Sequence, residues 1–380
     1  MASSATTYSE CQRPKPQGQQ LESCPAGTVY VSQTDPQSTF GTIQAAILSL
    51  PLDMSSQTIL IGPGNYHEVV NVTRKGPTTL LGITSDPDDY RRNQVHVWNS
   101  SYINQATQVA GQDNADASVL TVSPNRAASL VGSGPSGAPL QPEFGCVDFR
   151  TYNIDFANRA TVNGVEKKDG QTGPSAALSV SYANASFYQS TFYSYQDTVY
   201  IGRNASAFFY SGEVRGWTDY LYGFGRAWFE ATKLANRGNG GGLTAWKGST
   251  LFYGNDTNGV YMNRGSVVRA DDAPANLDLT HSCALGRPWN NMSVSIMKNM
   301  YQSDIVLPQG YIIWSKSDPR IVPGLTNFAE YNSMGPGWNA TARNQSIETI
   351  LTQDQANLYT VETVFGGIPS WIDLGTASLA

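Results

Sequence analysis

The middle of this 380-residue chain repeats a short aromatic pattern about every twenty residues. When the segments ASFYQSTF, SAFFYSGEV, RAWFEATKL and STLFYGN are aligned, four phenylalanines share one column at intervals of 22, 20 and 23 residues: Phe187, Phe209, Phe229 and Phe252. A period in the twenties, built from short β-prone runs, is typical of a β-solenoid whose coils stack in parallel. We therefore expect an interior ladder of phenylalanines. A Greek-key sandwich is the alternative, but it does not predict this register.

The rest of the chain fits the same all-β organisation, with few helices. We expect an extended N-terminal arm over residues 1–27 and a single β-helix domain over residues 28–380. An excursion loop is expected near residues 104–145, where Gly, Pro and Ser are frequent. Apolar residues at helical spacing predict a short capping helix near residues 43–50 and a C-terminal helical tail near residues 348–365.

Composition narrows the partners and the location. Only 14% of residues are charged, the net charge is −6 and the pI is about 5.1, which argues against a nucleic-acid partner. No apolar run approaches the ~18–20 residues that cross a bilayer, so we expect a soluble protein with no membrane partner. The sequence begins without the apolar core of a signal peptide, and we interpret it as a mature chain with an added Met; a cytosolic protein is the alternative.

Glycosylation motifs and cysteines suggest an extracellular setting. Eight Asn-X-Ser/Thr sequons favour a secreted glycoprotein. They begin at Asn71, Asn99, Asn184, Asn204, Asn255, Asn291, Asn339 and Asn344. The four cysteines are Cys11, Cys24, Cys146 and Cys283. Four cysteines allow three full pairings; a Cys11–Cys24 bridge would staple the N-terminal arm, and four buried free thiols are the alternative.

Two aspartates, Asp197 and Asp219, stand 22 residues apart in this aromatic region. That interval is about one coil, so both carboxylates would lie on one face of adjacent coils, roughly 4.8 Å apart. Two like charges at that distance raise one of the two pKa values. A reaction that needs one acid and one nucleophile or base uses such a pair. In the alternative reading, one Asp caps a turn and the other faces solvent.

A series of short blocks in a fixed order carries a family resemblance. The blocks are GNYHE, YQDTVY, GWTDYLYG, GLTAWKG, LGRPW, LPQGYIIW and FAEYNSMGPG. With them the chain resembles the pectin methylesterases, carbohydrate esterases built on a right-handed parallel β-helix, over roughly residues 28–372. The resemblance implies hydrolysis of the methyl esters of galacturonosyl residues in pectin, which releases methanol and leaves pectate. It implies no cofactor and no metal, and we expect a monomer.

The resemblance also assigns residues to the reaction. Asp219 would be the nucleophile, Asp197 the general acid and then the general base, and Gln196 an oxyanion donor. Arg287 and Trp289 match the LGRPW block. Arg287 lies 68 residues after Asp219, about three coils, so its guanidinium could reach that carboxylate, orient it and lower its pKa.

Aromatic side chains near these residues would form the platform for the substrate, because their apolar faces stack on sugar rings. Trp289 is the main candidate. Trp217, Tyr222 and Trp246 are further candidates, for which core packing is an equal alternative.

One position departs from the family pattern. The family often carries a second oxyanion glutamine about one coil before Gln196, where this chain has Pro174. The nearest glutamine is Gln171, 25 residues before Gln196. Either Gln171 reaches the site through a bulged loop, or one donor is missing.

Two other functions compete with the esterase. A β-helix lyase or glycosidase would need a calcium-binding acid cluster, or two acids ~6.5–9.5 Å apart around a water. A non-catalytic wall-polysaccharide-binding protein would need neither. Methanol release, as opposed to backbone cleavage or no reaction, separates the three.

Overall fold

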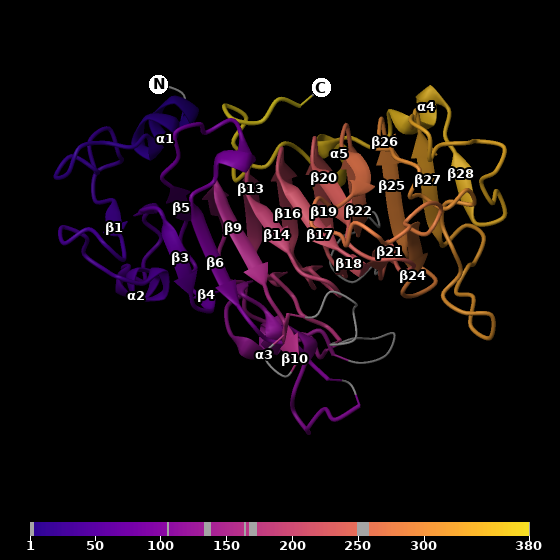
Figure 1. Ribbon diagram of the computed structural model, residues 1–380, viewed down its shortest axis with the longest axis horizontal. Helices are drawn as coiled ribbons and strands as arrows, with labels where there is room; N and C mark the ends of the chain where they lie inside the picture. The colour runs from indigo at the N-terminus through magenta and orange to yellow at the C-terminus, as the bar shows by residue number, and fades with distance from the viewer. Residues whose placement is uncertain are drawn as a thin grey trace.

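The computed structural model describes residues 4–104, 106–132, 138–162, 165–166, 173–248 and 258–379. Within these ranges the strands stack side by side along the long axis of the molecule (Figure 1). They form three long parallel sheets and one small antiparallel pair. This is the predicted all-β fold, a parallel β-helix.

The central coils each contribute one strand to each of the three long sheets, while the coils at the two ends contribute to fewer. The eleven-stranded sheet contains, in spatial order, β1 (Val29–Val31), β2 (Gln57–Ile61), β5 (Thr78–Gly82), β8 (Phe149–Tyr152), β13 (Asn184–Tyr188), β16 (Ser206–Tyr210), β19 (Arg226–Glu230), β22 (Gly259–Asn263), β25 (Val294–Lys298), β27 (Asn327–Tyr331) and β28 (Glu348–Ile350) among the described residues. The eight-stranded sheet contains β26 (Tyr301–Gln302), β23 (Ser266–Arg269), β20 (Lys233–Asn236), β17 (Glu213–Gly216), β14 (Thr191–Tyr193), β9 (Ile154–Asn158), β6 (Val95–Asn99) and β3 (Gly64–His67), again within the described ranges. The seven-stranded sheet contains β24 (Ala284–Pro288), β21 (Gly242–Trp246), β18 (Thr218–Gly223), β15 (Val199–Ile201), β12 (Leu178–Val180), β7 (Leu120–Val122) and β4 (Val70–Val72) in the same part of the chain.

The predicted phenylalanine ladder fills the interior. Phe187 pairs with Phe209 and Phe209 with Phe229, all three buried, with ring centroids 4.7 and 4.2 Å apart. In the next coil, however, Phe229 pairs with Met262. The predicted place of Phe252 in the ladder is therefore wrong, and Phe252 itself lies outside the described residues. The reason is an inserted connection between β21 and β22, which makes that coil longer than its predecessors.

The sequence had predicted an extended N-terminal arm over residues 1–27. That prediction is wrong in part, because Ser4–Gln12 forms the helix α1. The predicted Cys11–Cys24 disulfide is present, and Cys11 is buried against the β-helix. Cys146 and Cys283 are buried free thiols. The predicted capping helix is α2 (Ile43–Ser49), whose Ile43, Ala46 and Ile47 are buried at one end of the core.

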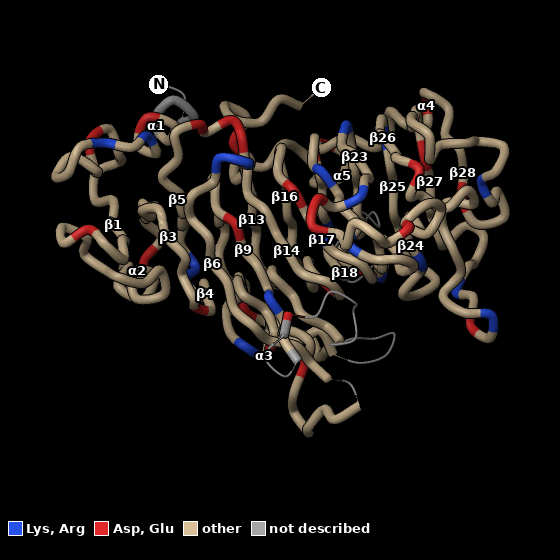
Figure 2. Tube along the Cα trace, in the orientation of Figure 1, with Lys and Arg blue, Asp and Glu red and all other residues tan. Residues whose placement is uncertain are grey.

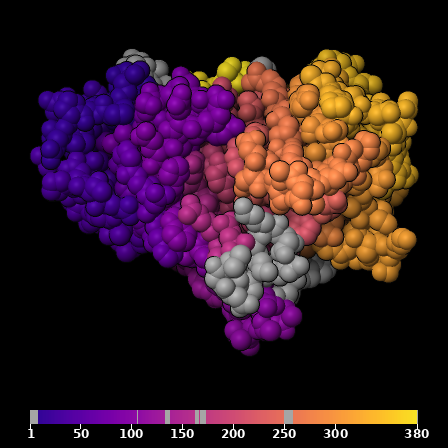
Figure 3. All heavy atoms as spheres, in the orientation of Figure 1, coloured from indigo at the N-terminus to yellow at the C-terminus, as the bar shows by residue number. Residues whose placement is uncertain are grey.

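The region predicted as an excursion loop is only partly a loop. It contains β7, a strand of the seven-stranded sheet, together with the 3₁₀ helix η2 (Asn114–Ala117) and the short helix α3 (Arg126–Ser129). Figures 1 and 3 show the purple part of this region projecting from the body of the β-helix. The pair β10 (Thr161–Val162) and β11 (Val165–Glu166) lies in the following excursion, and the 3₁₀ helix η1 (Tyr90–Arg92) precedes β6.

The C-terminal tail forms two short helices, α4 (Gln353–Ala356) and α5 (Val361–Phe365), rather than one. Thr352 and Thr360 each act as an N-cap, so the second cap starts a new helix. The last residues then return beside the N-terminal helix (Figure 1), where Asp373 accepts a hydrogen bond from the hydroxyl of Tyr152 at 2.8 Å.

Charged side chains are sparse and mixed. In the view of Figure 2, lysines and arginines alternate with acidic residues along the described chain rather than forming one basic face. None of the helices in the described ranges is both long and apolar enough to cross a membrane.

Candidate active site

The two aspartates lie on neighbouring coils, as their spacing predicted. β15 and β18 pair with Val199 opposite Leu221, and an isolated bridge joins Gln196 to Thr218 just before them. The backbone N–H of Asp197 donates to the carbonyl of Thr218 at 3.1 Å. This register sets Asp197 directly beside Asp219.

Both aspartates have an unusual backbone conformation. Their φ angles are +60° for Asp197 and +49° for Asp219, a left-handed region that Asp tolerates better than most residues because its short polar side chain bonds locally. The pairing of β18 with β21 also slips between Thr218 and Leu221, so a bulge spans Asp219. Bulges re-aim a side chain relative to the regular alternation of a strand. Each Asp keeps only 7% of its surface exposed.

Arg287 donates two hydrogen bonds to the carboxylate of Asp219. Its Nε donates to Oδ1 at 3.0 Å and its Nη2 to Oδ2 at 2.6 Å. Tyr222 pairs with Ala245, and Ala245 pairs with Arg287, so two coils and not the predicted three separate the partners. The prediction was wrong because the inserted residues between β21 and β24 lengthen one coil.

Burial and charge make the two carboxyls unequal. Burial raises the pKa of Asp197 well above its usual range, and the neighbouring Asp219 charge raises it further. Burial also raises the pKa of Asp219, although its bonds to Arg287 oppose that shift. The expectation of a net lowered pKa at Asp219 is therefore wrong, since burial outweighs the guanidinium. Of the two groups, only Asp219 has a cation bonded to it that favours the carboxylate, so Asp197 is the natural holder of the proton.

The amide positions around the pair differ from those expected. Gln196, half-buried, directly precedes Asp197, whereas Gln171 lies outside the described residues. The position in register with Gln196 is Ser175 rather than Pro174, because Leu178 pairs with Val199 and the Ser175 N–H donates to the Gln196 carbonyl at 3.0 Å. The Ser175 hydroxyl is buried against that of Ser194, so this register supplies no amide.

Trp289 follows the Arg287 strand β24 and packs against the cluster that contains Tyr222, but the other predicted aromatic residues play different parts. Trp289 is half-buried, with the Lys247 Nζ 3.7 Å from its ring centroid and the Tyr222 ring 5.8 Å away. Tyr222 is only 2% exposed and packs at a tilt against Tyr200, so it lies beneath the surface and is not an exposed platform.

The prediction for Trp246 is also wrong. Trp246 is 1% exposed and belongs to the main core, where its indole N–H donates to the Gly225 carbonyl at 3.0 Å. Trp217 is half-buried, packs over Gly238 and donates to the Asn239 carbonyl at 2.8 Å. Spacing alone left open which side of a strand each residue faces, and the structure decides it.

Two side chains at the site were missed by the sequence interpretation. The guanidiniums of Arg287 and Arg320 lie over the ring of Trp314, with their central carbons 4.1 and 4.3 Å from its centroid. Its only signal was its place at the end of the LPQGYIIW block. Asn114 reaches Asp197 from η2, with 3.5 Å between its Nδ2 and Oδ2 of Asp197. The Asp-Asn-Ala-Asp capping pattern of residues 113–116 was the signal that could have indicated an ordered turn there.

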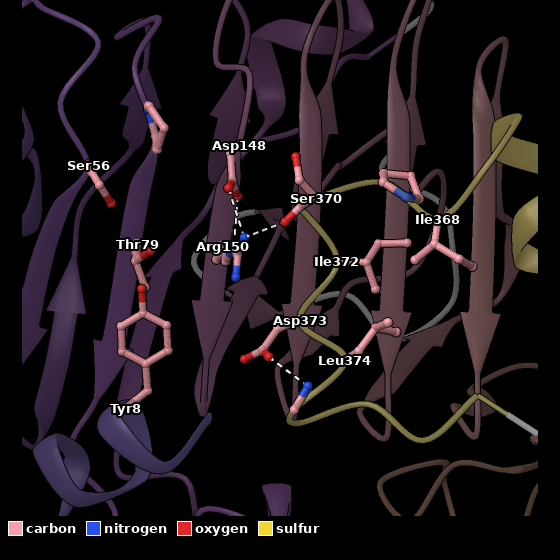
Figure 4. Close-up of a pocket in the computed structure, with 13 residues that line it drawn as sticks. Tyr8, Ser56, Thr79, Asp148, Arg150, Ile368, Ser370, Ile372, Asp373 and Leu374 are labelled. Atoms are coloured by element: carbon pink, nitrogen blue, oxygen red, sulfur yellow. Dashed lines mark hydrogen bonds and ion pairs between the residues drawn. The ribbon is translucent and has the colours of Figure 1, made fainter. Parts of the chain in front are cut away.

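A separate hollow lies far from this chemistry in the fold. It is lined by strands of the eleven-stranded sheet and by the C-terminal segment that crosses them (Figure 4). Arg150 spans it, paired with Asp148 at 2.7 Å and donating to the Ser370 carbonyl at 2.9 Å. The carboxyl pair belongs instead to the seven-stranded sheet, so this hollow is not the candidate active site.

A parallel β-helix that presents an Asp bonded bidentately by an Arg, a second buried Asp whose pKa is raised by burial, and tryptophans nearby defines a class, the β-helix hydrolases. Comparison with known proteins identifies the group within that class. The family model described as Pectinesterase matches residues 147–367, more than half of the chain. The chain belongs to the pectinesterase family.

Relatives and solved structures agree with this assignment. The chain is 28% identical to a probable pectinesterase A of Aspergillus fumigatus over 356 residues, which cover 92% of this chain and 90% of that one. It is 29% identical to pectinesterase A of Emericella nidulans over 293 residues, covering 76% and 74% of the two chains. The fold matches that of a carrot pectin methylesterase, with a TM-score of 0.72, 18% identity and coverage of 94% and 99%. It also matches a pectin methylesterase of Aspergillus niger, with a TM-score of 0.70, 23% identity and coverage of 92% and 96%.

Proposed function

We propose that this protein hydrolyses the methyl esters of galacturonosyl residues in pectin, releasing methanol and leaving pectate. The observation that carries the proposal is the bidentate bond of Arg287 to Asp219, with Asp197 buried beside it. The names of the similar proteins, pectinesterases and pectin methylesterases, support the substrate. A pectin methylesterase in complex with a hexasaccharide is among the similar structures.

In the first step, the Asp219 carboxylate attacks the carbonyl carbon of the ester. Arg287 holds this carboxylate in a fixed plane, which leaves one oxygen lone pair directed at the substrate. The carbonyl π electrons move to oxygen, where the amide of Gln196 donates to the oxyanion. Such a donor commonly contributes ~10²–10³-fold in turnover. The C–O bond to methoxide then breaks, and Asp197 transfers its proton so that methanol leaves.

In the second step, water attacks the acyl group now bound to Asp219. Asp197, a carboxylate after the first step, accepts a proton from that water as general base. The acyl–oxygen bond to Asp219 breaks, which regenerates its carboxylate beside Arg287 and leaves a free uronic acid. Ester and water are consumed, acid and methanol are formed, and both aspartates return to their starting states.

Trp289 and Trp314 supply the surface for the sugar chain. Both are half-buried beside Arg287, with part of each ring system accessible. Tyr222, buried under Trp289, supports this surface from below. Aromatic faces of this kind favour the apolar C–H face of a pyranose.

We further propose that the protein is a secreted, extracellular glycoprotein that acts as a monomer in cell wall modification. The Cys11–Cys24 disulfide supports an oxidising compartment, because such bonds persist outside the cytosol. Of the sequon asparagines, Asn71, Asn291 and Asn339 are exposed. One structure of the Aspergillus niger pectin methylesterase retains an N-acetylglucosamine stub.

Methanol release from esterified pectin by the purified protein tests the proposal. The unmodified protein should release methanol without new reducing ends or unsaturated products. Asp219→Ala and the near-isosteric Asp219→Asn should both lose the activity while remaining folded by circular dichroism. Asp354→Ala removes an exposed carboxylate from α4 and should behave as the unmodified protein. Near-normal release from folded Asp219→Ala would end the assignment of Asp219 as nucleophile.

A further inference from the structure

The excursion between β6 and β7 brings one amide to the acid/base carboxyl. Asn114, half-buried at the start of η2, places its Nδ2 3.5 Å from Oδ2 of Asp197. Within the described part of the preceding coil, the residue in register with Gln196 is Ser175, whose hydroxyl is turned into the interior. The amide of Asn114 comes from a different segment, 83 residues earlier in the chain than Asp197.

A hydrogen-bond network holds the turn that carries Asn114. The carboxylate of Asp113 accepts the backbone N–H groups of Ala115 at 2.9 Å, Val131 at 2.8 Å and Gly132 at 2.8 Å. The Asp116 carboxylate in turn accepts the N–H of Asp113 at 2.8 Å. These bonds close a capping box and tie η2 to the chain that follows α3.

Arg126 adds a second anchor. Its Nε and Nη2 donate to the two oxygens of Asp116 at 2.8 and 2.6 Å, and Nη2 also donates to the Gly111 carbonyl at 2.8 Å. An exposed ion pair of this kind contributes little by itself. Together with the cap, it connects the turn to Gly111 and to the start of α3.

The underside of the turn is packed onto the site. Ala115 and Val131 form one buried cluster with Tyr200, Tyr222 and Ala245. Trp289 and Trp314 pack against the same cluster. The turn that carries Asn114 is thus seated on the side chains that support the proposed substrate surface.

We propose that Asn114 is a positioning residue that orients the Asp197 carboxyl for proton transfer, an inference that rests on the esterase function proposed above. An N–H donor on Oδ2 disfavours a proton on that oxygen. The acidic proton is then held on Oδ1, free to meet the leaving methoxide. After the first step, the same N–H bonds to the ionised carboxylate while Oδ1 accepts the proton of water.

The charges around Asp197 set the sign of the pH effect. Asp219 from β18 raises its pKa and Arg287 from β24 lowers it. The buried Tyr222 also faces it from β18, and Asp113 lies beside Asn114 on the turn. A hydrogen bond donated to a carboxylate favours the charged form. Removing the Asn114 amide should therefore raise the pKa of Asp197.

The test is the pH dependence of methanol release by Asn114→Ala, with Gln112→Ala as the matched control. Gln112 is an exposed amide of the same loop, two residues earlier. A hydrogen bond to a charged group corresponds to about 10- to 100-fold, so kcat of Asn114→Ala should fall by about that factor while KM stays near its original value. The alkaline limb of kcat/KM, which requires protonated Asp197, should move up by about one pH unit. Gln112→Ala should change neither.

A second variant guards against an effect of folding. Asn114→Asp keeps the size of the side chain but replaces the donor by a carboxylate facing Asp197, so its kcat should lie below that of Asn114→Ala. Unchanged kcat and an unmoved limb in folded Asn114→Ala, or an equal loss in Gln112→Ala, would overturn the role of Asn114. Absence of methanol release from the unmodified protein would instead refute the esterase function itself, and the role of Asn114 with it.

Discussion

Replacement of Arg287 by Lys is the most informative change at the carboxyl pair. Arg287 makes two charge-assisted hydrogen bonds to Asp219, and Trp314 stacks on its guanidinium at 4.1 Å. Lys keeps the charge but offers a point contact instead of a planar fork. Losing one such bond costs about 1.5–3 kcal/mol, which corresponds to a rise of about 1–2 units in the pKa of Asp219. At pH values below the original pKa of Asp219, the ionised fraction of the nucleophile should fall about 10- to 100-fold.

The assay is kcat/KM for methanol release as a function of pH. Because the nucleophile must be ionised, the acidic limb of the profile should move to higher pH in Arg287→Lys, and the rate at low pH should fall most. Arg150→Lys is the matched control, since Arg150 makes the same kind of fork with Asp148, at 2.7 and 2.8 Å, on a different sheet. It should leave the profile unchanged. An Arg287→Lys enzyme with the original rate and an unmoved acidic limb would refute the reasoning that the fork controls Asp219.

Three further predictions follow from burial. Asp197→Asn should lower methanol release by about 10²–10⁴-fold. Because burial raises the pKa of Asp197 in the folded protein, the variant should also have a higher melting temperature at neutral pH. This difference should vanish below the usual Asp pKa, where Asp197 is protonated in both the folded and the unfolded state. Burial raises the pKa of Glu348 from 4.5 to about 8, so the free energy of unfolding of the unmodified protein should decline as the pH rises between those values. Chemical denaturation of Glu348→Gln across that range should show a smaller decline in the free energy of unfolding. Phe209→Ala opens a cavity between Phe187 and Phe229, which stack on it at 4.7 and 4.2 Å, and urea unfolding should show a loss of about 3–5 kcal/mol; a loss below about 1 kcal/mol would contradict its place in the ladder.

The sequence alone was sufficient to predict contacts between coils of similar length, because the same spacing rule applies to each of them. In stacked coils, a constant interval along the chain becomes a contact across the sheet, so the spacing of Phe187, Phe209 and Phe229 predicted the interior ladder. The same rule placed Asp197 beside Asp219. The ordered motif blocks then pointed to the family, because they include the residues around that pair.

The tertiary structure alone decided what depends on unequal coils and on the direction of side chains. The insertion before β22 put Met262 in the ladder, and the inserted residues between β21 and β24 left Arg287 two coils from Asp219, which no count based on a constant period could predict. Trp246 turned out to be a core residue, because interval does not determine which face of a strand a side chain occupies. Asn114 contacts Asp197 from a loop that is not part of the repeating coils. The position of that loop is determined by a capping box and by packing against residues that are distant in the chain.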